Sequence, residues 1–250
     1  MSKNHPLRSR HVALLLLIAS AAVYFIDYHF FGHGGDIAAG FLANLAFLPV
    51  YVLFVTLMIE RVLKERERHA LRQKLNMVIG VFFSEVGTKL LGDSFSFLVN
   101  GDELARLVKI TPQWTEADFR RVADYVTGHD IQVDSRRGDL QTLRSFLLAR
   151  RGFMLGLLEN PNLLEHDDFT DLLWAVFHLI EELEARRSFD RLPAADMEHL
   201  SGDIKRAYRH LLRQWVVYLI HLRHDYPYLF SLAVRTNPLN PDAHAEIVDT

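Results

Sequence analysis

The chain has 250 residues, of which 50% are hydrophobic, and its formal net charge is -3 at pH 7. A near-neutral charge argues against a nucleic-acid partner, because such proteins carry a strongly basic surface that neutralises phosphates. The chain contains no cysteine. Disulfides, thiolate metal sites and cysteine nucleophiles are therefore excluded.

Two long apolar blocks open the chain, at residues 12–31 and 37–59. Each is close to the roughly 20 residues with which a helix crosses a bilayer, and the link between them is short. Basic residues flank the blocks on both sides, and the link between the blocks contains none. Because basic residues stay in the cytoplasm, these features predict an N-terminal two-helix transmembrane hairpin at 12–59 with both termini cytoplasmic.

This topology predicts a multi-pass protein of the prokaryotic plasma (inner) membrane, with the lipid bilayer as a partner. Residues 1–11 are then a cytoplasmic N-terminal segment. The alternative is a cleaved signal peptide, since Ala19-Ser20-Ala21 resembles a small-residue cleavage site. Apolar residues continue through Ile26, as a membrane helix requires, so a spanning helix is the preferred interpretation.

The sequence after the second apolar block predicts an all-α domain, because no segment alternates apolar and polar residues as a strand does. Residues 60–74 mix acids and bases at helical spacing and predict a charged juxtamembrane helix. Residues 75–91 carry an apolar stripe that lies either in the core or along the membrane surface, and the core is preferred.

Four further helices are expected in this cytoplasmic multi-helix bundle. Their signals are a capping pattern at Thr115 and a stop at Gly128, and apolar stripes within 139–159, 167–187 and 196–224. Pro227 interrupts the last of them. Prolines then recur, so the domain is predicted to cover 75–236 and a flexible tail 237–250.

The histidines raise the question of a metal site. His221, His224 and Asp225 share one helical face at spacings of three and four residues, and imidazole and carboxylate groups ligate divalent metals. Structural or surface roles are the alternative for these three residues. His178, Glu181 and Glu182 also lie on one face but reverse the Glu-x-x-His order of di-iron bundles, and the matching motifs from other helices are missing, so they are not predicted as ligands.

A second polar group lies in the predicted hairpin. It consists of Asp27, His29, His33, Asp36 and Asn44. Ionisable residues at membrane depth are costly and often functional, and these side chains suit proton or divalent-cation binding. An ordinary position at the membrane interface is the alternative.

No catalytic residue or cofactor is predicted, because the chain has no phosphate-binding glycine loop and no nucleophile elbow. The leading hypothesis is a non-enzymatic, membrane-anchored helical module that binds a partner protein or forms a homo-oligomer. One alternative is a small transporter or channel with a path lined by Asn44 and Asp27. Another is a metal-dependent hydrolase in the helical domain.

Overall fold

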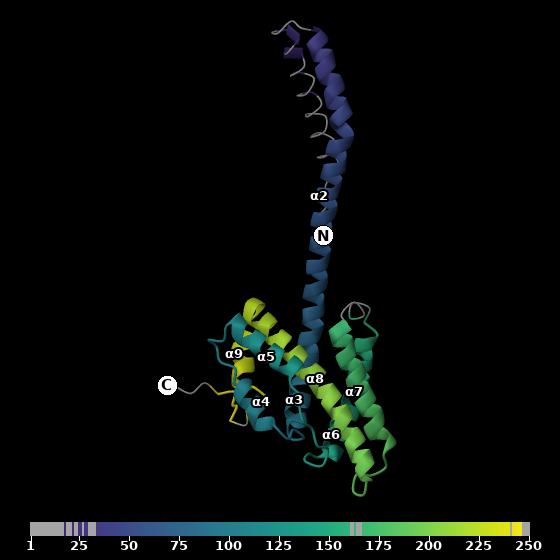
Figure 1. Ribbon diagram of the computed structural model, residues 1–250, viewed down its shortest axis with the longest axis vertical. Helices are drawn as coiled ribbons and strands as arrows, with labels where there is room; N and C mark the ends of the chain where they lie inside the picture. The colour runs from purple at the N-terminus through teal and green to yellow at the C-terminus, as the bar shows by residue number, and fades with distance from the viewer. Residues whose placement is uncertain are drawn as a thin grey trace. The chain divides into compact units, whose positions relative to one another are not determined.

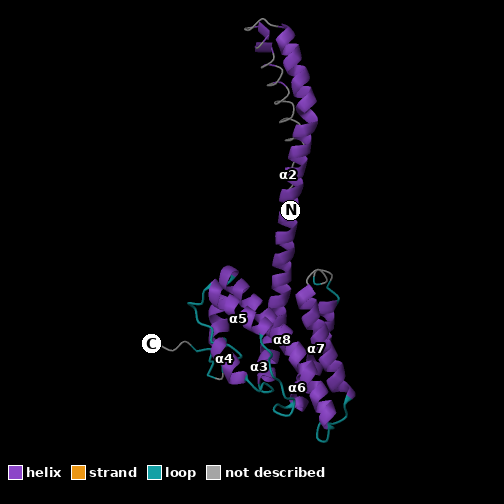
Figure 2. Ribbon diagram, in the orientation of Figure 1, coloured by secondary structure: helices purple, strands orange, loops and turns teal. Residues whose placement is uncertain are grey.

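The computed structural model describes residues 18, 22, 25, 26, 28, 29, 34–160, 163, 167–240 and 242–246. The elements of this described part are helices joined by loops, without a strand (Figure 2). A single isolated bridge joins Leu98 and Val133. The predicted all-α class is therefore confirmed. The chain divides into two compact units, one ending at Arg68 and one beginning at His69.

The long helix α2 (Gly34–Phe82) contains the second apolar block (Figure 1). Within the described residues, no helix combines the length and the apolar character needed to cross a membrane. This finding contradicts the predicted transmembrane hairpin at 12–59 and the multi-pass membrane location. The prediction judged the run 37–59 by itself, whereas the run is one part of a helix that continues into the charged residues 60–74. Residues 1–11 and most of 12–31 lie outside the described part.

Helix α2 passes directly into the π-helix η1 (Phe83–Gly87) and then α3 (Thr88–Phe95). A Cβ atom on Gly87 would lie 2.6 Å from the Phe83 ring and 2.8 Å from the Phe82 ring, so a side chain does not fit there. The π-turn adds a residue to the helical repeat. The predicted stripe of 75–91 is in the core, because Leu75 and Ile79 are buried with Phe82.

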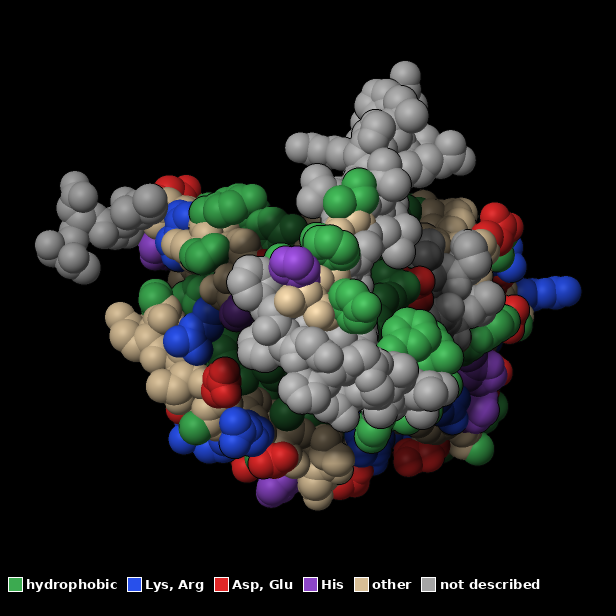
Figure 3. All heavy atoms as spheres, turned by 90° about the horizontal axis from the view of Figure 1, so that it is seen from above, with side chains coloured by type: hydrophobic (Ala, Val, Ile, Leu, Met, Phe, Trp, Pro, Cys, Tyr) green, Lys and Arg blue, Asp and Glu red, His purple; other side chains and the backbone are tan. Residues whose placement is uncertain are grey.

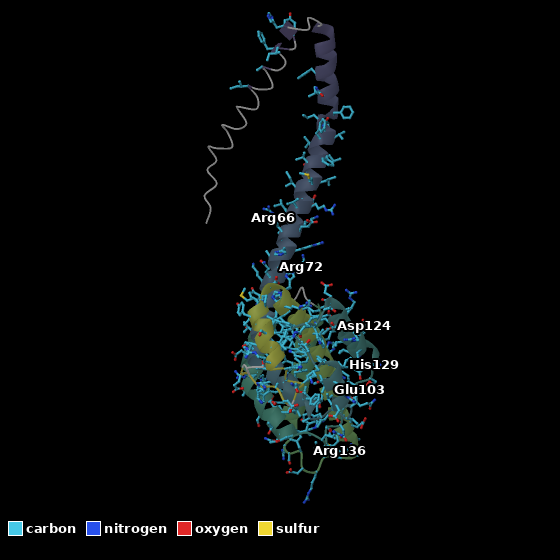
Figure 4. The ribbon with its side chains drawn as sticks, turned by 90° about the vertical axis from the view of Figure 1, so that its left-hand side faces the viewer. Arg66, Arg72, Glu103, Asp124, His129 and Arg136 are labelled. Atoms are coloured by element: carbon cyan, nitrogen blue, oxygen red, sulfur yellow. The ribbon has the colours of Figure 1, made fainter. Side chains whose placement is uncertain are left out.

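Two shorter helices follow, α4 (Gly101–Leu107) and α5 (Glu116–Gly128). Thr115 and Asp118 form the predicted capping box of α5, with Asp118 Oδ2 accepting from the Thr115 backbone N–H at 2.7 Å. The side view in Figure 4 shows Glu103 of α4 on the same side of the domain as Asp124 and His129. The sequence did not predict α4.

Three long helices form the rest of the core, α6 (Leu140–Leu158), α7 (Asp167–Ala185) and α8 (Ala194–Asp225). Helix α7 packs against α8 and α6, and α5 packs against α8 (Figure 1). All three lie where apolar periodicity predicted helices. Their apolar faces are almost completely buried. The core of α7 and α8 includes Phe169, Leu172, Val176, Ile180, Ile204, Tyr208, Leu211, Trp215 and Leu219.

The chain then turns into α9 (Pro227–Arg235), with Pro227 in the first turn, where a missing N–H is not needed. Beyond it, Asn237 is buried and its Nδ2 donates to the Val108 carbonyl oxygen at 2.9 Å. Leu239 is also buried. The packed domain therefore continues past residue 236, where the sequence predicted a flexible tail, because a polar anchor and an apolar residue hold the segment.

Candidate metal centre

Helices α7 and α8 are antiparallel and share one polar edge. Across it, Arg213 Nη2 lies 3.1 Å from Asp168 Oδ2, and Arg186 Nη2 lies 2.5 Å from Asp196 Oδ1. These two pairs mark the ends of the edge. Polar residues at spacings of three and four on each helix occupy the positions between them.

Four of these residues converge near the α7–α8 loop. They are His178, Glu182, His199 and Asp203, and one ligand atom from each lies within 4.8 Å of the other three. Among the described residues, this is the one group of three or more such side chains with that spacing. Each helix contributes a histidine and, four residues later, a carboxylate. That spacing places both on one helical face.

The four side chains form a ring of alternating imidazole and carboxylate groups. His178 Nε2 lies 3.8 Å from Glu182 Oε1 and 3.4 Å from Asp203 Oδ1. His199 Nε2 lies 3.4 Å from Glu182 Oε2 and 3.3 Å from Asp203 Oδ2. Ligand atoms around a tetrahedral Zn²⁺ with bonds of about 2.0–2.1 Å are roughly 3.3 Å apart. The four contacts involve both oxygens of each carboxylate, and one ligand atom from each residue lies within 4.8 Å of the others, so the side chains would draw together to hold such an ion.

Asp203 is the buried member of the ring, with 2% of its side chain exposed. Its Oδ1 accepts a hydrogen bond from Arg206 Nη1 at 3.0 Å. Its Oδ2 is inaccessible to solvent and accepts no hydrogen bond from any described residue. His199 Nε2 lies 3.3 Å from this oxygen without forming a hydrogen bond, and a buried carboxylate oxygen without a hydrogen bond is costly, so this atom is suited to bind a cation.

Glu182 is held in place from its own helix. Its Oε2 accepts from Arg186 Nη1 at 2.8 Å, and Arg186 also binds Asp196. Hydrogen bonding to Arg186 lowers the pKa of the Glu182 carboxyl, with a smaller contribution from His199. The carboxyl is therefore ionised at neutral pH, as a metal ligand must be.

The exposed fractions define an open side. The side chains of His178 and His199 are 42% and 53% exposed, and that of Glu182 is 26% exposed. An ion can therefore reach the ring from solvent while Asp203 forms its floor. Imidazole nitrogen together with carboxylate oxygen suits Zn²⁺ and other divalent first-row metals.

The structure also brings His221, His224 and Asp225 together at the end of α8. His221 Nδ1 lies 2.7 Å from Asp225 Oδ2, and His224 Nδ1 lies 2.6 Å from Asp225 Oδ1. Asn76 Nδ2 is 3.1 Å from His221 Nδ1. Each oxygen of Asp225 thus already has an imidazole partner. Metal binding by this set stays a prediction.

The polar residues of the predicted hairpin are described only in part. Asp27 and His33 lie outside the described residues, and Asp36 lies in the first turn of α2. The His29 ring stacks on Phe25 at 6.2 Å between centroids, and Asn44 is exposed. The described residues therefore do not show whether these five side chains meet.

Sequence reasoning missed His199 and Asp203 and set aside His178 and Glu182. The available signal was a repeated pattern, His followed four residues later by an acid, on two successive predicted helices. This pattern does not have the Glu-x-x-His order of di-iron bundles, so it did not predict a ligand set. No local pattern tells which faces of two helices meet.

Comparison with known proteins assigns both parts of the chain to described families. Residues 71–235 match the family described as "Uncharacterized protein MJ1433, C-terminal helical domain", and residues 3–63 match "MJ1433, N-terminal helical domain". The chain is 41% identical over 231 residues to "Uncharacterized protein MJ1433" of Methanocaldococcus jannaschii, covering 92% of each protein. No solved structure matches the chain.

Proposed function

The chain belongs to the MJ1433 family, and we propose that its helical domain binds one divalent first-row metal ion through His178, Glu182, His199 and Asp203. The observation that carries this proposal is the buried Asp203 Oδ2, which accepts no hydrogen bond from the described residues. A bound cation would give this buried oxygen a partner, and both imidazole nitrogens could ligate the same ion.

The ligand number favours binding over catalysis. Four protein ligands complete a tetrahedral zinc site, whereas catalytic zinc keeps one position open for water or substrate. The ion would cross-link α7 and α8 near their connecting loop and stabilise the folded domain by mass action. Hydrolysis by a metal with a larger coordination number is the less supported alternative.

Titration of the chelator-treated protein with Zn²⁺, followed by calorimetry and thermal unfolding, tests the proposal. We expect one ion per chain, and a stabilisation of about 2.7 kcal/mol when free Zn²⁺ is about 100 times the Kd. The variant His199→Gln removes one ligand from an exposed position, so the fold should be kept. We expect its affinity for Zn²⁺ to fall by roughly 100-fold or more.

The matched control is His224→Gln, which removes an imidazole that is 85% exposed on the same helix. It should bind Zn²⁺ as the unaltered chain does. Equal losses in both variants, or a loss only in His224→Gln, would place the metal elsewhere. No binding at all would overturn the proposal.

A second candidate function is self-association, the homo-oligomer form of the predicted partner binding. The observation that supports it is a long run of exposed large apolar side chains on α2, for example Phe47 at 58% and Phe54 at 68% exposure. Contiguous apolar surface of this kind is typical of interaction sites. The oligomeric state of the full chain in solution tests it.

A further inference from the structure

A pocket of about 210 Å³ lies between α5 and α8, which are neighbours in the fold (Figure 1). Residues Val126 and Thr127 line it from the end of α5. The other lining residues come from α8 and are all basic or imidazole side chains. They are Arg206, Arg209, His210 and Arg213.

The spacing explains why these four side chains meet. Steps of three, one and three residues place them on one face of α8, about two turns long. On the face of the molecule seen in Figure 3, basic and acidic side chains are interspersed around the rim. Three arginines around one concavity are therefore a local concentration of positive charge.

Nearby acids neutralise this charge only in part. Arg213 pairs with Asp168, and Arg206 pairs with the buried Asp203. Arg209 has no ion pair with any described residue.

His210 adds a neutral donor to the pocket. The ring is partly buried, and burial is the main cause that lowers its pKa. Arg213 and Arg209 lower the pKa further, while Asp171 and Asp168 oppose them. A neutral imidazole has one N–H to donate, so it can bind an anion without adding charge.

We infer that this pocket binds a phosphate group, held by Arg206, Arg209 and Arg213 with His210 as a further donor. Guanidinium groups bind phosphate through paired N–H donors. Three arginines on one helical face offer more N–H donors than the two oxygens of a carboxylate can accept. A tetrahedral phosphate presents three or four oxygens, so it can accept hydrogen bonds from all three arginines. The volume lies below the roughly 300–1,000 Å³ of pockets for drug-sized ligands, which favours a small phosphate compound.

The end of α5 weakly disfavours the binding of an anion in this pocket. The pocket touches the last turn of α5, where unpaired carbonyl groups carry a partial negative charge of about half an elementary charge. Arg206 and Arg213 are paired with Asp203 and Asp168, so Arg209 leaves a net charge of about +1, which is still larger than this partial charge. The site is separate from the proposed metal centre, although Arg206 contacts both, through its pairing with Asp203 and its place in the pocket wall.

Phosphorus NMR and calorimetry of the full chain with inorganic phosphate test the inference. A chelator is present throughout, so that the result does not depend on the metal proposal. We expect saturable binding in the millimolar range or tighter, weakened by salt because the contacts are ionic. The variant Arg209→Gln should bind phosphate roughly tenfold or more weakly, because charge-assisted hydrogen bonds are lost.

The control variant is Arg223→Gln, which removes the same charge from the same helix about 21 Å away. It should change the affinity less than about twofold, since screening is strong at that distance. A glycerol phosphate distinguishes a free ion from the phosphate end of a metabolite, and binding of either supports the inference. Equal losses in the two variants, acetate binding as tightly as phosphate, a preference for an oligonucleotide, or no binding would overturn it.

Discussion

Gly138 shows how one residue without a side chain can limit the packing of the core. A Cβ atom at this position would lie 2.5–2.6 Å from atoms of the Phe97 ring. Phe97 is 1% exposed, so its ring has little room to move. Glycine is therefore required here for close approach.

We expect Gly138→Ala to lower the free energy of unfolding by about 1–3 kcal/mol, the usual cost of overpacking a core. Chemical denaturation followed by circular dichroism measures this change. The matched control is Gly152→Ala in α6, where a Cβ atom meets nothing within 4 Å. That variant should gain about 0.5–1 kcal/mol, because alanine favours a helix. A gain of stability in both variants would contradict the packing argument.

At the scale of the element, the start of α6 depends on one carboxylate. Asp139 Oδ1 accepts from the backbone N–H groups of Gln141 at 2.9 Å and Thr142 at 3.0 Å. Its Oδ2 accepts from the Thr142 hydroxyl at 2.6 Å. These hydrogen bonds to Thr142 and Gln141 lower the pKa of the Asp139 carboxyl.

The lowered pKa gives a pH dependence with a definite sign. A carboxyl that titrates lower in the folded chain stabilises the fold above its unfolded pKa of about 3.9. This stabilisation is lost as the pH falls through the folded value. We therefore expect the Tm to fall below about pH 4, and Asp139→Asn to show less of this fall, because its amide oxygen still caps α6.

Scanning calorimetry between neutral and acidic pH makes the comparison. Asp124→Asn is the control, since this exposed residue lies on α5 and caps no helix. Its profile should follow that of the unaltered chain. Equal pH profiles for Asp139→Asn and the unaltered chain would show that the cap carboxylate contributes nothing to acid unfolding.

At the scale of the whole molecule, the two compact units differ in how far their apolar side chains are exposed to solvent. The unit from His69 onward buries most of its large apolar side chains in one contiguous core, with exceptions such as Trp174 and Tyr228. The unit that ends at Arg68 exposes large apolar residues along α2, from Phe41 to Leu63. Exposed apolar area of this kind is removed from water when chains associate.

We therefore expect the full chain to be oligomeric in solution and the fragment that begins at His69 to be a monomer. Light scattering coupled to size-exclusion chromatography measures both masses. The double variant Phe47→Ser with Phe54→Ser should weaken association of the full chain. A monomeric full chain, or a fragment that associates equally, would rule out α2 as the interface.

Local signals in the sequence predicted much of the helical framework. The capping box at Thr115 and the apolar stripes of 139–159 and 167–187 depend on neighbours within a few residues. For that reason their helices were placed within a few residues of their observed ends. The π-helix and α4 were missed, because tight packing at Gly87 and a helix of seven residues leave no periodic signal.

The sequence by itself determined that the chain is helical, where most helices begin and end, and that His178 and Glu182 share one face. Only the tertiary structure decided that His199 and Asp203 face them across α7 and α8, and that Asp203 is buried there. The physical reason is the distance along the chain over which each interaction acts. Caps and periodicity act over three or four residues, whereas the register between two packed helices is set by the whole core.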